Sequence, residues 1–263
     1  MNTVTSAAPI LMVDDVAVRF GGVVALDGLT FSVAPHSIHA VIGPNGSGKT
    51  TLLNSVSGAY RPDRGSIRLS GAEVIGQPPH AIAGLGLART FQNIRLFQTL
   101  TVLENVMTAR PPAGPVMFFS TVLGLRAARD LEAATVEHAR RALKRVGLEQ
   151  FADTKANALP YARQRLLEIA RALAREPALM LLDEPAAGMN MTEARELMTL
   201  VRSIRDDGIT IVLVEHNMRL VMDISERITV LDFGKKIAEG TPDEVRSNPD
   251  VIRAYLGTGR KRA

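Results

Sequence analysis

The sequence predicts an α/β fold in which a helical subdomain is inserted into a core with a phosphate-binding loop. An apolar run at Ile38–Ile42 is followed by a glycine-rich loop and by a helical pattern over Lys49–Val56. This order of strand, loop and helix gathers backbone N–H groups around a phosphate. From about residue 93 to residue 173 apolar residues recur at helical spacing, and from residue 174 strands and helices alternate again.

Composition narrows the class of protein. Hydrophobic residues make up 46% of the 263 residues and charged residues 22%, which is ordinary for a soluble globular protein. The formal net charge of +4 is too small to indicate nucleic-acid binding, although it suits a protein that works near an anionic membrane face. The absence of cysteine excludes disulfides, thiolate metal sites and cysteine nucleophiles.

The sequence shows neither an evident signal peptide nor a membrane-spanning stretch. The N-terminus lacks a basic region followed by an apolar one. The most apolar irregular segment, Pro111–Leu125, is interrupted by prolines and glycines and is too short to cross a bilayer. We expect it to pack as a loop on the helical subdomain, with an orientation toward membrane partners as the alternative. Any membrane role is therefore expected to depend on partners.

Strands and helices flank the predicted insertion. Before it, apolar clusters predict strands at 11–19, 28–33 and 66–69. After it, continuous apolar runs at Ala178–Leu182 and Ile209–Val214 indicate strands that are buried on both faces of a parallel sheet. An amphipathic helix is expected over Glu193–Arg205. The last predicted elements are a strand pair at Ile228–Leu231 and Lys236–Ala238 and a helix that begins at Pro242–Arg246.

The strongest motif follows the strand at Ile38–Ile42. It matches the pattern G-x-x-x-x-G-K-[ST] and comprises Gly43, Pro44, Asn45, Gly46, Ser47, Gly48, Lys49 and Thr50, with Thr51 next in the helix. Average composition gives a chance match in roughly one chain in a hundred of this length, so the pattern is specific. Lys49 is expected to reach the β- and γ-phosphates of ATP as a catalytic residue, and the Thr50 hydroxyl to bind Mg²⁺.

A second motif lies at the end of the strand in the region Ala178–Leu182, where Asp183 and Glu184 follow four apolar residues. Ligands of open α/β sheets bind at the carboxyl ends of the strands, so these two carboxylates are expected at the site. Downstream of a phosphate-binding loop, Asp183 would hold Mg²⁺ through water. Glu184 would polarise the attacking water as the general base.

Together with further motifs, these residues resemble those of ABC transporter nucleotide-binding subunits, and the resemblance covers essentially the whole chain. It implies that Gln92, in Thr90–Asn93, contacts Mg²⁺ or the attacking water. It implies also that His216 is the switch histidine that contacts the γ-phosphate and acts in catalysis, and that Phe20 stacks on adenine.

The resemblance also implies the architecture. The fold would be a P-loop NTPase with a mixed RecA-like core, an N-terminal antiparallel β subdomain and an inserted α-helical subdomain. Residues 1–92 and 174–263 would form the ATP-binding core with the β subdomain. Residues 93–173 would form the helical insertion, which contains the family's signature motif.

The signature motif departs from the family pattern Leu-Ser-Gly-Gly-Gln. The aligned stretch begins at Leu159 and continues with Pro160, Tyr161, Ala162 and Arg163. Pro160 has neither the hydroxyl nor the N–H that a serine would provide. A helix is expected over Gln164–Leu173, with its N-terminal dipole directed outward. By resemblance, Ala162 and Arg163 would contact the γ-phosphate that an opposite subunit holds.

Three segments are similar to the high-affinity branched-chain amino-acid importers: Arg89–Gln92, Ala186–Asn190 and Asn248–Gly257. The resemblance therefore implies an ATPase for branched-chain amino-acid import. Related importers carry urea or short-chain amides, and other amino acids also remain open. A different class is a non-transport ABC ATPase that acts on nucleic acid or the ribosome. Such proteins usually add coiled coils, zinc modules or a second cassette, none of which is evident here.

The resemblance implies several partners. Two subunits would close head to tail on ATP and separate after hydrolysis, so a second ATPase subunit, identical or different, is expected. Transmembrane permease subunits would follow this motion, and an extracytoplasmic solute-binding protein would select the solute. No nucleic-acid partner is expected. The chain would lie on the cytoplasmic face of the bacterial inner membrane, bound through the permease subunits.

Overall fold

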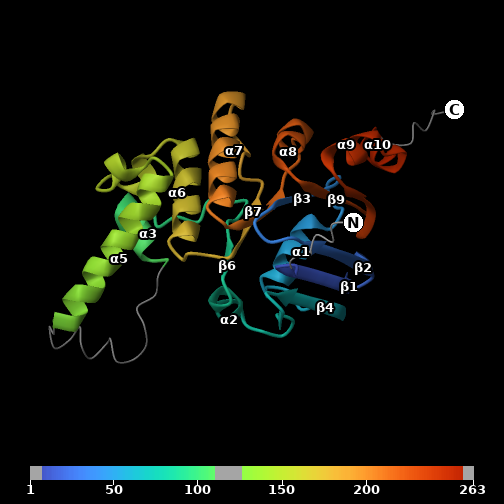
Figure 1. Ribbon diagram of the computed structural model, residues 1–263, viewed down its shortest axis with the longest axis horizontal. Helices are drawn as coiled ribbons and strands as arrows, with labels where there is room; N and C mark the ends of the chain where they lie inside the picture. The colour runs from blue at the N-terminus through green and yellow to red at the C-terminus, as the bar shows by residue number, and fades with distance from the viewer. Residues whose placement is uncertain (1–7, 110–125, 257–263) are drawn as a thin grey trace, which may run out of the picture. The chain divides into compact units, whose positions relative to one another are not determined.

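The computed structural model describes residues 8–109 and 126–256, which divide into two compact units. The core unit contains the described parts of Met1–Arg89, Ala178–Ala187 and Ala194–Ala263, and the helical unit those of Thr90–Pro177 and Gly188–Glu193. Figure 1 shows the elements of both. The segment Pro111–Leu125, expected to pack on the helical subdomain, lies outside the described residues.

The N-terminal part of the core unit is an antiparallel sheet with the strand order β2-β1-β4-β5 (Figure 1). Its strands are β1 (Leu11–Phe20), β2 (Val23–Val33), β4 (Arg64–Leu69) and β5 (Ala72–Glu73). The structure confirms the strands expected near 11–19, 28–33 and 66–69. It extends the second back to Val23, where two adjacent valines are exposed and the sequence gives no alternating pattern.

A second sheet of six strands has the order β10-β9-β3-β8-β7-β6. Its strands are β3 (Ile38–Ile42), β6 (Leu87–Arg89), β7 (Leu179–Asp183), β8 (Thr210–Val214), β9 (Arg227–Asp232) and β10 (Lys235–Gly240). All pairings are parallel except that of β9 with β10. Every residue of β3, β7 and β8 is buried, which confirms the expectation of strands covered on both faces.

Helix α1 (Lys49–Val56) packs between the two sheets of the core unit. One apolar cluster joins residues of the antiparallel sheet, such as Val13 and Leu29, to Leu52 and Leu53 of α1 and to Leu181 of β7. Because this cluster packs both β3 and α1, the loop between them is held at each end by a buried element.

The C-terminal helices of the core unit cover a different part of the parallel sheet. Helices α8 (Met218–Ile224), α9 (Pro242–Ser247) and α10 (Pro249–Leu256) contribute Val221, Val245 and Val251 to a cluster with residues of β3 and β9. The sequence predicted one helix from Pro242. The structure divides it at Asn248, which is extended and whose side chain caps the start of α10.

Two further helices belong to the core unit wholly or in part. Helix α2 (Pro79–Gly84) precedes β6, and α7 (Met191–Asp206) runs from the helical unit into the core unit. The amphipathic helix expected over Glu193–Arg205 is confirmed as most of α7, with Leu197, Val201 and Ile204 buried. Among the described residues, α2, α8, β5 and β6 are elements that the sequence patterns did not indicate.

The helical unit contains α3 (Val102–Met107), α5 (Arg126–Arg145) and α6 (Tyr161–Leu173), with short 3-10 turns at Glu149–Phe151 and Ala156–Ala158. No named strand occurs in its described residues, which confirms the expected helical character. The expected start of the last helix at Gln164 is wrong. Helix α6 begins three residues earlier, because Pro160 occupies the N-cap in an extended conformation and its carbonyl accepts the Gln164 N–H.

Candidate active site

The predicted phosphate-binding loop lies between the buried end of β3 and the start of α1. Gly43 has a φ of 153°, and a Cβ built there would lie 2.1 Å from the carbonyl oxygen of Leu231. A side chain at this position would therefore collide with β9, so the backbone requires glycine. Helix α1 has no acidic residue in its first turn and no side-chain cap, which leaves its N-terminal N–H groups and their positive potential available to an anion.

Lys49, the first residue of α1, directs its side chain back over this loop. Its ammonium donates to the carbonyl oxygens of Gly43 at 2.7 Å and Pro44 at 2.9 Å. Burial lowers the pKa of Lys49, while the carboxylates of Glu184 and Asp183 act to raise it. The approach of an anion stabilises the charged form of a buried ammonium whose pKa is lowered, so the loop suits a polyphosphate.

Two further features of the loop fit a phosphate ligand. The Ser47 hydroxyl is buried and has no hydrogen-bond partner among the described residues. Thr50 and Asn45 are exposed beside it. Since buried hydroxyls nearly always have a partner, the Ser47 oxygen is available to a phosphate or to a water between them.

Asp183 ends β7 and lies almost fully buried beside an arginine that the sequence reasoning did not select. Arg89, the last residue of β6, places its guanidinium 3.3 Å from the Asp183 carboxylate. It also donates to Asn54 at 2.7 Å and to the Ser57 hydroxyl at 2.8 Å, both near the end of α1. Burial raises the pKa of Asp183, and Arg89 lowers it in opposition. Arg89 therefore helps to keep Asp183 ionised.

Glu184 and His216 come from neighbouring strand ends. Glu184 follows β7 in a left-handed conformation with a φ of 46°, and its N–H donates to the Val214 carbonyl at the end of β8. His216 Nδ1 lies 3.9 Å from the Glu184 carboxylate, and the imidazole is largely exposed. A strained non-glycine residue at the carboxyl end of a parallel strand is typical of a functional site.

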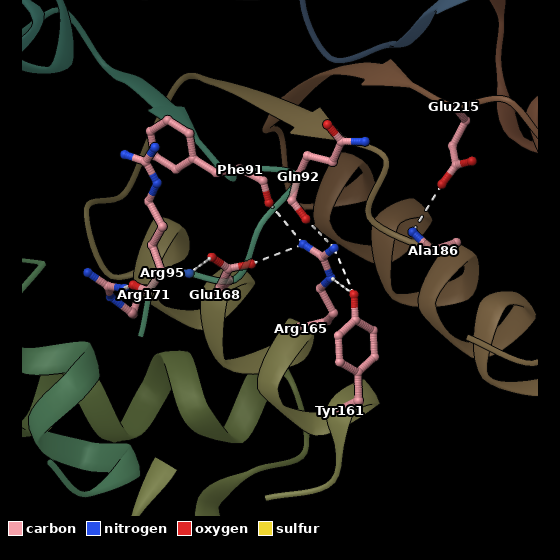
Figure 2. Close-up of polar contacts among 9 residues, drawn as sticks. All are labelled: Phe91, Gln92, Arg95, Tyr161, Arg165, Glu168, Arg171, Ala186 and Glu215. Atoms are coloured by element: carbon pink, nitrogen blue, oxygen red, sulfur yellow. Dashed lines mark hydrogen bonds and ion pairs between the residues drawn. The ribbon is translucent and has the colours of Figure 1, made fainter. Parts of the chain in front are cut away.

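Glu215, which lies between β8 and His216, is a second residue that the sequence reasoning missed. Its carboxylate is 1% exposed and accepts the N–H of Ala186 at 3.0 Å (Figure 2). It also accepts the N–H of His216 at 3.1 Å. Glu215 therefore holds the main chain at Ala186, two residues after Glu184, and at His216 itself. The motif Val214-Glu215-His216 gave a signal for the histidine but none for the structural role of the glutamate.

Phe20, which was expected to stack on adenine, lies at the end of β1. Its ring is 47% exposed and contacts Tyr60 edge to face, with 5.1 Å between the ring centroids. An exposed aromatic face held by a second ring is available for stacking. The core unit thus brings together Lys49, Asp183, Glu184 and His216 and presents Phe20 at its surface.

The remaining predicted residues lie in the helical unit. Gln92 is exposed, and its main chain is held by Arg165 of α6, which donates to the carbonyl oxygens of Phe91 and Gln92 (Figure 2). Ala162 lies in the first turn of α6, beyond the uncapped Pro160. The guanidinium of Arg163 stacks on the ring of Phe151 at 4.2 Å, so its side chain already has a partner in this unit.

Comparisons with known proteins identify the family. The family model described as ABC transporter matches residues 26–187, which includes the phosphate-binding loop and the Asp183–Glu184 pair. The chain belongs to the ABC transporter ATP-binding family. A second model of this group, described as branched-chain amino acid ATP-binding cassette transporter, matches residues 235–261.

Individual members of the ABC family are similar over nearly the whole chain. The high-affinity branched-chain amino acid transport ATP-binding protein BraF of Pseudomonas aeruginosa is 44% identical, over 95% of this chain and 98% of that protein. LivG of Escherichia coli, of the same description, is 43% identical over the same shares. A probable LivG of Archaeoglobus fulgidus is 37% identical, over 94% of this chain and 95% of that protein.

Solved ABC cassettes confirm the fold. A nucleotide-free ATP-binding cassette of an ABC transporter has a TM-score of 0.82 and 30% identity, over 95% of this chain and 99% of that one. The ADP conformation of the cassette MJ1267 gives the same score and identity, over 95% and 100%. The chain is therefore an ABC-type ATPase of the P-loop class, with the expected α/β core, antiparallel β subdomain and helical insertion.

Family membership also sets the general behaviour of the chain. ABC cassettes bind nucleotide, form dimers and work with membrane permeases. Within residues 8–109 and 126–256, none of the helices has the length and hydrophobicity that a membrane crossing requires. The general resemblance to an ABC transport ATPase is thus confirmed, whereas the role of each site residue remains a prediction.

Proposed function

We propose that this chain is the ATP-hydrolysing subunit of an importer of branched-chain amino acids. The proposal depends on one observation above all. In the core unit, Lys49 and the loop before it, the buried Asp183, and Glu184 with His216 lie at the carboxyl ends of adjacent parallel strands, which supports the proposal. The names of the similar proteins BraF and LivG, and the match at residues 235–261, support the choice of solute.

Each residue of the core unit has a proposed task. The loop from Gly43 to Thr51 would cradle the phosphates of ATP, and Lys49 would neutralise their charge. Glu184 would orient and deprotonate the attacking water, with His216 close to the γ-phosphate. Phe20 would stack on the adenine ring. When bound, Mg²⁺ would neutralise phosphate charge, and the oxygens of Thr50, Asp183 and Gln92 are of the kind that this ion prefers.

The proposed site is completed by a second ATPase subunit. The uncapped start of α6, with the N–H of Ala162 and the backbone of Arg163, would meet the γ-phosphate held by the opposite subunit. Because Pro160 cannot donate a hydrogen bond, this half-site would hydrolyse more slowly than one completed by a standard signature. This difference favours a heterodimer with a second ATPase subunit that has a standard signature, and a homodimer is the alternative.

The proposed assembly includes partners that select and move the solute. Transmembrane permease subunits would bind the dimer at the cytoplasmic face of the bacterial inner membrane, and an extracytoplasmic solute-binding protein would deliver the amino acid. ATP-driven closing and opening of the dimer would then switch the access of the permease.

Sedimentation of purified Glu184→Gln protein, with and without Mg·ATP, tests the ATPase part of the proposal. This variant should bind ATP without hydrolysing it, and Lys49→Met should lose binding. A dimer that appears only with ATP would show that the Pro160-containing signature closes on nucleotide in a homodimer. A monomer despite measured ATP binding would indicate a different partner subunit. Failure of the wild-type chain to bind ATP would refute the proposal.

Uptake measurements test the solute. A strain without this subunit should lose high-affinity uptake of leucine, isoleucine and valine, and the wild-type chain should restore it while Lys49→Met does not. Unchanged leucine uptake together with lost urea or amide uptake would reject branched-chain amino acids in favour of that alternative.

A further inference from the structure

Tyr161, the first residue of α6, contacts Arg165 one turn further along the same helix and Gly188, which is distant in sequence. Its hydroxyl lies 2.9 Å from Nη2 and 3.2 Å from Nε of Arg165 (Figure 2). Arg165 is buried and donates to the Phe91 carbonyl at 2.9 Å and to the Gln92 carbonyl. The hydroxyl therefore accepts from the same guanidinium that holds the main chain of Gln92.

The aromatic ring of Tyr161 contacts a different segment. A Cβ built on Gly188 would lie 2.9 Å from Cε1 of this ring and 3.3 Å from Cζ. Gly188 also has a φ of 79°, a conformation that side chains rarely adopt. The ring and the glycine backbone are thus in close contact, a few residues after the expected general base.

Glu168 completes the attachment of the Gln92 segment to α6. Its carboxylate lies 3.3 Å from Nη1 of Arg165 and accepts the N–H of Arg95 at 2.8 Å (Figure 2). Burial raises the pKa of Glu168, and the Arg95 N–H, Arg165 and Arg171 oppose this effect. Residues 91–95 are therefore bonded at both ends to side chains of one helix.

Packing alone does not account for Tyr161. The residue remains 45% exposed, so its ring contributes little to the buried core. Its hydroxyl instead accepts hydrogen bonds from Nε and Nη2 of Arg165, on the side of the guanidinium opposite Glu168. Without the hydroxyl, these N–H groups would have to bond to water. This arrangement orients the Arg165 guanidinium toward the carbonyl oxygens of Phe91 and Gln92.

We propose that Tyr161 is a positioning residue for the ATPase reaction: it holds the start of α6, the Gln92 segment and Gly188 together so that they move as one piece. The inference rests on the proposed function, in which these three segments meet nucleotide, Mg²⁺ or the partner subunit. Gln92 then reports the state of the site together with the signature helix of the same chain.

The Tyr161→Phe variant isolates the hydroxyl, because it keeps the ring against Gly188. Amide hydrogen exchange, followed by mass spectrometry of peptides that cover residues 91–95, should become about 5- to 10-fold faster, as expected for one lost hydrogen bond. The matched control is Thr108→Val, which removes another hydroxyl bond of the same unit, at 2.7 Å to the Asn105 carbonyl oxygen and outside residues 91–95. Unchanged exchange of residues 91–95 in Tyr161→Phe would overturn the inference.

Gly188→Ala tests the ring contact. The added methyl should displace Tyr161 and also accelerate exchange of residues 91–95. Gly147→Ala is its control in the same unit, because Gly147 also has a positive φ, of 70°, but a Cβ there meets nothing within 4 Å. Equal exchange in both alanine variants would reject the role of the ring.

The ATPase kinetics of the assembled transporter distinguish a positioning role of Tyr161 from a purely structural one. In Tyr161→Phe, kcat for ATP should fall about 3- to 10-fold while KM for ATP stays within twofold, because Lys49 and its loop belong to the core unit. An unchanged kcat would overturn the inference. If the wild-type assembly fails to bind ATP, the proposed function is wrong, while the exchange measurements still decide whether Tyr161 holds residues 91–95.

Discussion

His39 gives the chain a calculable sensitivity to acid. His39 lies on β3, the strand that leads into the loop at Gly43, and is 1% exposed. Its Nε2 lies 2.9 Å from the Thr229 hydroxyl. Burial lowers its pKa from 6.5 to about 4; the Glu239 carboxylate opposes this shift, and Arg227 and Lys236 add smaller contributions in the direction of burial. The folded protein therefore keeps the imidazole neutral at pH values where the unfolded chain binds a proton.

The sign of the effect follows from this difference. Above pH 6.5 both states are neutral at His39 and the stability contribution is complete. As the pH falls from 6.5 toward 4, only the unfolded chain gains the proton, so folding loses stability. Between pH 7.5 and 5.5 the loss from a pKa of 6.5 unfolded and about 4 folded is about 1.4 kcal/mol. That is a tenfold change in the folding equilibrium.

His39→Gln tests this calculation, because glutamine can bond Thr229 but does not titrate. Urea unfolding is followed by circular dichroism at pH 7.5 and 5.5 for both proteins. The variant loses some stability at each pH, partly because the His39 contact with Phe31 is removed. Its decrease in stability between the two pH values should be smaller than that of the wild type by about 1.4 kcal/mol.

The matched control is His80→Gln, on an exposed position of α2. Because the His80 side chain is exposed and that of His39 is buried, this variant should show the pH dependence of stability of the wild type. If His39→Gln and the wild type lose the same stability between pH 7.5 and 5.5, burial of His39 is not the source of acid sensitivity and the reasoning is refuted.

Two further substitutions test the active-site geometry. Arg89→Gln should lower the unfolding free energy by about 3 kcal/mol, measured in urea, because Asp183 is left buried without its guanidinium partner. Arg68→Gln, which breaks an exposed ion pair, should lower the unfolding free energy by less than about 1 kcal/mol. Equal losses of stability in the two variants would contradict the role of burial. Gly43→Ala should abolish ATP binding in a fluorescent-nucleotide titration, because its methyl collides with the Leu231 carbonyl. Gly76→Ala, outside the loop, shares a positive φ but has open space around its Cβ, so it should leave binding nearly unchanged; comparable losses in the two would contradict the steric argument.

The sequence was sufficient for features that are contiguous in the chain. Gly43–Thr50 lies within eight consecutive positions, and Asp183–Glu184 directly follows a run of apolar residues, so both motifs and their flanking strands could be recognised without coordinates. The α/β class and the helical insertion followed from hydrophobic periodicity, which is a local property. The start of α6 differs from the expectation because the helix was expected only after Arg163, although proline is compatible with the position just before a helix.

The contacts that hold the site depend on the tertiary structure. Arg89 and Asp183 are 94 positions apart, Arg165 and Phe91 are 74 apart, and Glu215 and Ala186 are 29 apart. No sequence period links such pairs, because their distance is set by strand order and helix packing. The sequence alone thus indicated which groups are expected to bind and hydrolyse ATP. Only the fold decided which buried arginines and glutamates hold those groups, since a buried charge bonds to whatever partner the packing brings within hydrogen-bond distance.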